Sequence, residues 1–361
     1  MTRILKIEAR VERLAAEGAA AGYGGVEAAP FVLCRIHAEG GLTGTGITGR
    51  FLAEQVAALL QGPFADALAG EDARDIERLR RLLISRFNPR GGTGVFAAAL
   101  SALDIAWWDL RARALGEPLW RVLGGARRRV ECYATVGLPA FSEHTLAATC
   151  REWIEKGFTG VKMLVAAGGR SLEEDARRVR AVRRAIGHGA MLMIDANCGL
   201  SVAEARRLAH LVADCDIAWF EEPVFDNDIE ALIQLRQSIP MPIAAGQMMQ
   251  SLSWFRDAMA RGALDWVNCN ACYCGGISGM LRVLTLAEAH GLPVAHAGGW
   301  DIANAAVLAG HGHGGLLEVH AAQLGLRGLL AEEMAPASGA LTLPERPGIG
   351  FAFRWEEEGG G

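Results

Sequence analysis

Three short segments decide the fold: MLMIDAN (191–197), IAWFEEP (217–223) and PIAAGQ (242–247). Each is an apolar run with the length of a buried strand, and each carries a polar side chain at or near its end. Those side chains are Asp195, Glu221 and Gln247, and neighbouring ones lie 26 residues apart. A strand, a loop and a helix fill an interval of that length, so the three segments indicate a repeated βα unit.

The same unit recurs along most of the chain after residue 130. Five further strand-like runs begin at Glu131, Gly160, Trp266, Pro293 and Gly315, which makes eight. Helix signals lie between the strands, namely the capping boxes Ser171–Glu174 and Ser201–Glu204 and the helix-ending glycines Gly157, Gly187, Gly262 and Gly291. Eight parallel strands with helical crossovers predict an α/β fold, a closed (β/α)8 barrel. The alternative, an open doubly wound sheet, needs a Gly-rich dinucleotide turn, which follows none of these strands.

The two ends of the chain do not follow this repeat. Residues 1–125 contain two alternating runs followed by helical segments, so we expect an α+β capping domain there. The barrel then occupies residues 126–320. A Pro- and Gly-broken tail, residues 321–361, is expected to return to the capping domain.

Composition narrows the class of protein. The net charge of −5 supplies no basic stripe for a nucleic-acid backbone, and no run of 18 uncharged apolar residues offers a membrane span. Eight cysteines without a secretory leader favour reduced thiols and a cytoplasmic location. Cys269, Cys272 and Cys274 are interpreted as small residues packing the barrel rather than as a thiolate metal site.

The polar residues at the strand ends predict a metal site. In a parallel barrel the carboxyl ends of the strands converge on one face, where catalytic groups collect. Asp195, Glu221 and Gln247 end the third, fourth and fifth barrel strands, so their oxygens can face a common point. Carboxylate and amide oxygens suit Mg²⁺. The plainer interpretation of each acidic residue is a helix cap or a solvated loop position.

Several motifs resemble those of a known family. IDAN (194–197), FEEP (220–223), the GGIS turn (275–278) and the helix within residues 99–125 are similar to motifs of the enolase superfamily, in its mandelate racemase and muconate lactonizing branch. The resemblance covers nearly the whole chain. It implies that magnesium binds a substrate carboxylate while a base removes the proton alpha to it, giving an enediolate.

The resemblance also implies residue roles. Asp195 and Glu221 match metal ligands, and Gln247 stands at the third ligand position, where relatives of the dehydratase type tolerate an amide. Asn197 matches a position that can hydrogen-bond the substrate carboxylate. Glu222 fits an acceptor behind the ligands. Glu318, at the end of the eighth strand, lies near a position where the branch places an acidic group facing the substrate carboxylate.

Three positions depart from the family pattern. The second strand usually ends in Lys-x-Lys, whose second lysine is a base, but here Lys162 is followed by Met163 and Leu164. Lys162 alone therefore remains as a cation. Asn270 replaces an aspartate that usually holds the histidine of the seventh strand. The histidine here, His296, comes one residue earlier than the usual pattern places it; it is the predicted base, with the alternative that this one-residue slip turns it into a core histidine.

The remaining residues favour elimination over racemisation. Racemisation needs a proton-transfer group on each face of the substrate, whereas one histidine can serve elimination first as base and then as acid. The sequence therefore predicts a magnesium-dependent lyase, a hydro-lyase that dehydrates a sugar acid. The alternatives are a cycloisomerase or epimerase on a related carboxylate or lactone, and a binding protein that keeps the fold but has lost catalysis.

We also expect a mobile loop over the site and assembly into an oligomer. Residues 16–30 have the glycine content of a mobile loop, and Tyr23 and Arg50 are candidate substrate contacts on the capping domain. The partner is expected to be a small carboxylate, and the resemblance implies an even-numbered homo-oligomer.

Overall fold

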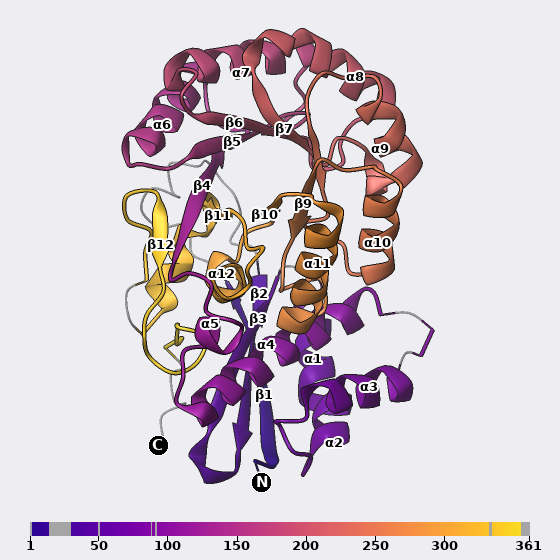
Figure 1. The fold of residues 1–361 in the computed structure, drawn as a ribbon, viewed down its shortest axis with the longest axis vertical. Helices are drawn as coiled ribbons and strands as arrows, with labels where there is room; N and C mark the ends of the chain where they lie inside the picture. Colours follow the sequence, from indigo (N-terminus) through magenta and orange to yellow (C-terminus); the bar gives the residue numbers. More distant parts are fainter. Residues whose placement is uncertain are drawn as a thin grey trace.

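The computed structural model describes residues 2–13, 30–49, 51–87, 89–90, 92–331 and 334–354. Tyr23 and Arg50, the two predicted substrate contacts of the capping domain, lie outside these residues. The chain forms a barrel with a smaller α+β layer against one side of it (Figure 1).

The capping layer is a three-stranded antiparallel sheet covered by helices. Its strands are ordered β1-β2-β3 and comprise β1 (Ile4–Arg13), β2 (Pro30–Ala38) and β3 (Thr43–Thr48). The helical segments that follow are α1 (Ala53–Leu59), η3 (Leu60–Phe64), α2 (Ala65–Leu68), α3 (Ile76–Phe87), α4 (Val95–Leu115) and α5 (Leu119–Val122). Glycine allows α4 to lie directly on β3, because a Cβ at Gly46 would stand 1.9 Å from the carbonyl oxygen of Ala102.

The eight predicted strands form one closed parallel barrel, which confirms the fold prediction. They are β4 (Arg129–Gly137), β5 (Gly160–Leu164), β6 (Met191–Asp195), β7 (Ile217–Glu221), β8 (Ile243–Ala245), β9 (Trp266–Cys269), β10 (Val294–His296) and β11 (Leu317–His320). Their order is β10-β9-β8-β7-β6-β5-β4-β11, and a parallel bridge between Ala295 and Leu316 joins the two ends.

Helices cover the outside of the barrel between successive strands (Figure 1). They are α6 (Glu143–Glu155), α7 (Leu172–Ile186), α8 (Val202–Leu211), α9 (Ile229–Arg236), α10 (Leu252–Ala260), α11 (Gly276–His290) and α12 (Asp301–Gly310). Both capping boxes form as predicted, at Ser171 and Ser201. Inside the barrel, a small buried cluster contains Tyr133, Met193, Trp219, Ala244 and Ala295.

Buried charges connect the capping layer to the barrel. Asp104 of α4 is fully buried, accepts a hydrogen bond from the backbone N–H of Ser278 at 2.8 Å, and pairs with Arg80 at 2.6 Å. Arg80 also donates to the carbonyl of Gly275. The GGIS turn is thereby held against α4, so the barrel face near β9 keeps a fixed position relative to the cap.

The C-terminal segment runs back along the capping layer. Short strand β12 (Ala340–Thr342) pairs antiparallel with β4, and the backbone N–H of Ile349 donates to Asp109 of α4 at 2.7 Å. The ring of Phe353 lies 6.5 Å from that of Phe31 in β2. The domain limits at residues 125 and 320 stay a prediction.

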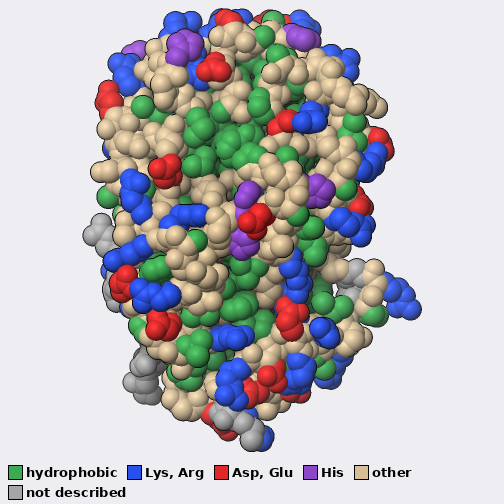
Figure 2. Space-filling view, in the orientation of Figure 1, with side chains coloured by type: hydrophobic (Ala, Val, Ile, Leu, Met, Phe, Trp, Pro, Cys, Tyr) green, Lys and Arg blue, Asp and Glu red, His purple; other side chains and the backbone are tan. Residues whose placement is uncertain are grey.

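Three further observations concern the described residues. Within the described residues, no helix combines the length and the apolar character that crossing a bilayer requires. All eight cysteines lie in the described part of the chain, and none forms a disulfide. On the face shown in Figure 2, hydrophobic side chains gather over the barrel, and charged side chains of both signs are interspersed around them.

Candidate active site

The centre of the site is a buried lysine surrounded by carboxylates. Lys162 of β5 is 1% exposed, and its Nζ lies 2.5 Å from Glu221 Oε1, 3.0 Å from Glu318 Oε1 and 3.2 Å from Asp195 Oδ2. The carboxylates come from β6, β7 and β11, so residues far apart in the sequence meet at the carboxyl ends of the strands. Register explains the meeting, because Asp195 pairs directly with Glu221.

Electrostatics keep this lysine charged. Burial alone would lower the pKa of Lys162, but the carboxylates of Glu221, Glu318 and Asp195 outweigh it and raise that pKa well above its usual value. Lys162 is therefore a fixed cation and has no lone pair with which to act as a base.

The carboxylates themselves respond in opposite directions. Burial raises the pKa of Glu221 well above its usual value, despite the ammonium of Lys162 beside it. Burial would also raise the pKa of Glu318, but Lys162, His320 and His296 outweigh it and hold that pKa at about 2. Three ionised carboxylates beside one ammonium carry an excess of negative charge. Together with burial, this excess raises the pKa of Glu221.

This donor set fits a divalent cation. Asp195 Oδ2 and Glu221 Oε1 already converge on one positive atom, the Nζ of Lys162. Burial and the neighbouring carboxylates raise the pKa of Glu221, so positive charge placed beside it is favourable. Within the described ranges, however, no three or more His, Cys, Asp or Glu side chains are arranged to hold a metal ion. A site here would thus use two carboxylates and other oxygens.

Gln247 lies beside these carboxylates but is bonded elsewhere. It follows β8 and is 3% exposed, and its Nε2 donates to Glu222 Oε2 at 2.6 Å. Glu222 also accepts from Asn227 Nδ2 at 2.8 Å, and burial raises its pKa to about 6. Because the amide nitrogen is bound to Glu222, the amide oxygen is the atom left for a cation.

The loops that follow β6 and β7 have unusual backbone conformations. Asn197, Cys198 and Glu222 all have positive φ, at 45°, 60° and 39°. The backbone N–H of Asn197 donates to Asp195 Oδ1 at 2.8 Å, which fixes that carboxylate. Left-handed residues other than glycine cost energy and cluster at functional sites. Asn197 is exposed, so its side chain is accessible.

His296 is fully buried, and both of its ring nitrogens contact backbone groups. Nε2 lies 2.7 Å from the carbonyl oxygen of Gly299, and Nδ1 accepts the N–H of Glu318 at 3.3 Å. Burial lowers the pKa of His296, although the Glu318 carboxylate opposes that change. Its neighbour Ala295 packs in the inner cluster, so strand alternation turns His296 away from the barrel axis.

Asn270 donates to the Gly299 carbonyl that His296 contacts, and it makes no hydrogen bond to the imidazole of His296. Its Nδ2 donates to the carbonyls of Ala297 and Gly299 at 2.8 and 2.9 Å. Its Oδ1 accepts from the N–H of Cys272 and from Asn304. Asn270 therefore fixes the loop against which His296 rests.

Some residues of the site are not evident from the sequence. Thr135 donates to Glu318 Oε1 at 2.5 Å, and Trp219 Nε1 donates to Glu221 Oε2 at 3.0 Å. Gly299 N–H donates to Glu318 Oε2 at 2.6 Å, so both oxygens of Glu318 are engaged within the protein. The available signal for Thr135 is its register opposite Lys162, which requires the strand pairing to be known.

Comparison with protein families gives two matches. Residues 7–124 match the description "Mandelate racemase / muconate lactonizing enzyme, N-terminal domain". Residues 145–357 match "Enolase C-terminal domain-like".

Three similar proteins illustrate the range of relatives. A 3,6-anhydro-alpha-L-galactonate cycloisomerase of Streptomyces coelicolor is 32% identical, over 91% of this chain and 90% of its own. An L-talarate/galactarate dehydratase of Salmonella typhimurium is 36% identical, over 64% of this chain and 58% of its own. A mandelate racemase/muconate lactonizing enzyme from a marine actinobacterium, solved in complex with magnesium, superposes with a TM-score of 0.85 at 30% identity, covering 98% of each chain.

Proposed function

Because the chain belongs to the mandelate racemase/muconate lactonizing enzyme family of the enolase superfamily, we propose that it is a magnesium-dependent hydro-lyase that removes water from a sugar acid. The observation that carries this function is the convergence of Asp195 Oδ2 and Glu221 Oε1 on the charged Nζ of Lys162. Positive charge at this point stabilises the negative charge that develops when a carboxylate loses its alpha proton.

Asp195 and Glu221 would hold the magnesium ion, with the amide oxygen of Gln247 as a third protein ligand. Magnesium, when bound, supplies additional charge stabilisation to the substrate carboxylate. Lys162 provides a fixed positive charge beside it, and the accessible side chain of Asn197 supplies a hydrogen-bond donor. Glu318 serves mainly to orient Lys162 and the loop at Gly299, since both of its oxygens are occupied.

His296 is proposed as the base through its Nδ1 atom. The strong bond from Nε2 to the Gly299 carbonyl fixes the tautomer with its proton on Nε2, which leaves the Nδ1 lone pair. Because strand alternation turns His296 away from the barrel axis, this role requires its ring to leave the long contact of Nδ1 with the N–H of Glu318, at 3.3 Å, and to rotate toward the site when substrate binds. Asn270 holds the Gly299 carbonyl and takes the positioning role that an aspartate has in the family pattern.

The opposite face of the substrate has no second base at the family position. Leu164 stands there, and its backbone pairs in register with Asp195. With one base, the same histidine can return its proton to the departing hydroxyl. This supports elimination of a beta hydroxyl over racemisation.

Asn270→Asp is expected to lower kcat at least about tenfold rather than raise it. The new carboxylate cannot donate to the carbonyls of Ala297 and Gly299, so the loop that orients His296 loses its support. Steady-state kinetics on the accepted substrate provide the measurement. A higher kcat in this variant would show that Asn270 acts on the imidazole directly. Gln237→Glu, which changes an exposed amide after α9 to a carboxylate away from this loop, is the control.

A direct test is incubation with aldonic and aldaric acids in the presence of magnesium, followed by an assay for 2-oxo acids. Dehydration across the alpha and beta carbons gives an enol that becomes a 2-oxo acid. We expect 2-oxo acid from at least one compound, and none from the His296→Asn variant. Turnover without any 2-oxo acid would reject dehydration.

A cycloisomerase is the second candidate. The cycloisomerase of Streptomyces coelicolor matches 91% of this chain, against 64% for the dehydratase of Salmonella typhimurium. The same alpha-proton removal can expel a ring oxygen instead of a hydroxyl. Lactones and anhydro sugar acids should therefore be included beside the open-chain acids, because loss of the cyclic substrate without loss of water would identify this activity.

A further inference from the structure

Strand β1 forms an edge of the capping sheet whose backbone groups point outward. Within the described residues, β1 pairs with β2 on one side and with no other strand. The backbone N–H of Thr45 in β3 points away from β2, to Asp109 of α4. Backbone groups alternate in direction along antiparallel strands, so the pairing of β3 with β2 and of β2 with β1 directs the N–H and C=O groups of Ile7, Ala9 and Val11 away from β2. The carbonyl of Ala9 agrees with this, because it accepts a hydrogen bond from Gln61 Nε2 at 2.7 Å.

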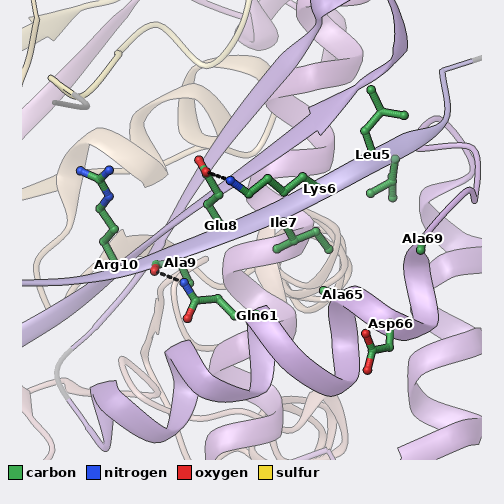
Figure 3. Close-up of a pocket in the computed structure, with 11 residues that line it drawn as sticks. Leu5, Lys6, Ile7, Glu8, Ala9, Arg10, Gln61, Ala65, Asp66 and Ala69 are labelled. Carbon is green, nitrogen blue, oxygen red and sulfur yellow. Dashed lines mark hydrogen bonds and ion pairs between the residues drawn. The ribbon is translucent and has the colours of Figure 1, made fainter. Parts of the chain in front are cut away.

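The side chains of β1 alternate in charge as well as in burial. Ile7 and Ala9 are buried against the helices of the cap, whereas four charged residues share the other face of the sheet. In order they are Lys6, Glu8, Arg10 and Glu12. Lys6 is 65% exposed and pairs with Glu8, as Figure 3 shows.

We propose that β1 pairs antiparallel with β1 of a second copy of this chain, with Ala9 opposite Ala9. In that register Lys6 faces Glu12 of the partner and Glu8 faces Arg10 of the partner. The two-fold axis repeats both contacts, so four cross-strand pairs of opposite charge form. Such pairs stabilise antiparallel strands, whereas like charges opposite each other destabilise them.

The charge pattern selects this register over its neighbours. Centring the pair on Glu8 sets Glu8 against Glu8 and Lys6 against Arg10. Centring it on Arg10 sets Arg10 against Arg10 and Glu8 against Glu12. Both shifts keep the outward backbone groups opposite each other, and both bring like charges together. Charge complementarity therefore favours pairing of β1 with β1 of a second copy, in the register that places Ala9 opposite Ala9.

A groove beside β1 leaves room for the second strand. It has a volume of about 650 Å³ and lies between β1 and the helical residues Gln61, Ala65, Asp66 and Ala69. Figure 3 shows these residues below the strand. Leu5, which lines the groove, is 65% exposed, so it offers apolar surface that a second strand can cover. On pairing, Gln61 releases the carbonyl of Ala9 to the partner strand.

Charge reversal tests the interface without altering the core. Full-length wild type, Lys6→Glu, Glu12→Lys and the double variant are compared by sedimentation velocity and light scattering over a range of concentrations and salt. Each single reversal creates two like-charge contacts, so we expect the dissociation constant of the assembly to rise about tenfold or more. The double variant restores opposite charges and should recover the wild-type mass.

The control is Lys156→Glu, the same change at a lysine that is 54% exposed on α6. It should leave the assembly unchanged. Circular dichroism and thermal unfolding show that the single variants are folded. A wild type that stays monomeric, or an assembly that both single reversals leave intact, would overturn the interface. Failure of the double variant to recover would overturn the register.

Discussion

Lys162→Met is expected to lower the free energy of unfolding by about 3–5 kcal/mol at neutral pH, because breaking a buried ion pair leaves uncompensated charge. Lys162 balances three carboxylates that have almost no contact with solvent. Methionine keeps much of the length and apolar stem of lysine and removes only the charge. Urea unfolding followed by circular dichroism measures the change.

The pH dependence of this loss and a control variant show whether the buried charge causes it. Without the ammonium, the pKa of Glu221, which burial already raises, rises further, and the pKa of Glu318 is no longer held low, so the folded variant takes up protons there and the loss should shrink as pH falls from 8 to 5. Lys156→Met removes an exposed lysine that pairs with Glu152, and it should cost less than about 0.5 kcal/mol. Adding Glu318→Gln to Lys162→Met should recover part of the loss. Equal losses at both lysines would contradict the electrostatic account of the site.

The second large effect concerns magnesium. Asp195→Asn is expected to abolish measurable magnesium binding and to lower turnover at least about 100-fold, because it removes one of the two proposed carboxylate ligands. Gln247→Glu should act in the opposite direction. At about 4 Å and an effective dielectric constant near 20, one added charge contributes roughly 4 kcal/mol, so binding should tighten at least about tenfold.

Titration calorimetry with magnesium measures both variants. Wild-type affinity is expected to be weak and to improve when a substrate acid is present, since two carboxylates and an amide hold the cation less firmly than three carboxylates. Gln237→Glu, the same substitution at an exposed residue after α9, is the control and should bind as wild type does. If Gln247→Glu bound magnesium no more tightly than wild type, Gln247 would not be a ligand.

Much of the fold follows from local sequence patterns. The eight barrel strands are short apolar runs, and the capping boxes at Ser171 and Ser201 mark helix starts whose chemistry is contained within four residues. Strand β3 is harder to predict. Its sequence TGTGIT has two glycines that weaken a strand by propensity, and they are explained only by the close packing of α4.

Some contacts of the site could also be predicted from the sequence, and others could not. Asp195 and Glu221 could be predicted to meet, because equal spacing in a repeat gives equal positions in a barrel, and their register bears this out. The contacts of Glu318, His296 and Asn270 could not. They depend on the backbone of the loop at Gly298–Trp300, where three consecutive residues have positive φ. The position of a loop carbonyl is set by packing across strands, which a single sequence does not encode locally.

The departures from the family pattern are what a protein that binds its ligand without catalysis would also show. Leu164 stands at the position of the usual lysine, and both ring nitrogens of His296 are engaged by backbone groups. Intact Asp195, Glu221 and Lys162 argue for retained chemistry, because a buried cluster of this kind is costly to keep for stability alone.

Removal of the alpha proton is the central claim, and exchange with heavy water tests it most directly. The protein is incubated in D2O with magnesium and a set of sugar acids and lactones, and the mixtures are followed by NMR. We predict that at least one compound loses its alpha hydrogen and gives a 2-oxo product carrying one solvent deuterium on the neighbouring carbon, and that Asp195→Asn gives none. Magnesium binding without any loss of alpha hydrogen across the whole set would contradict the account.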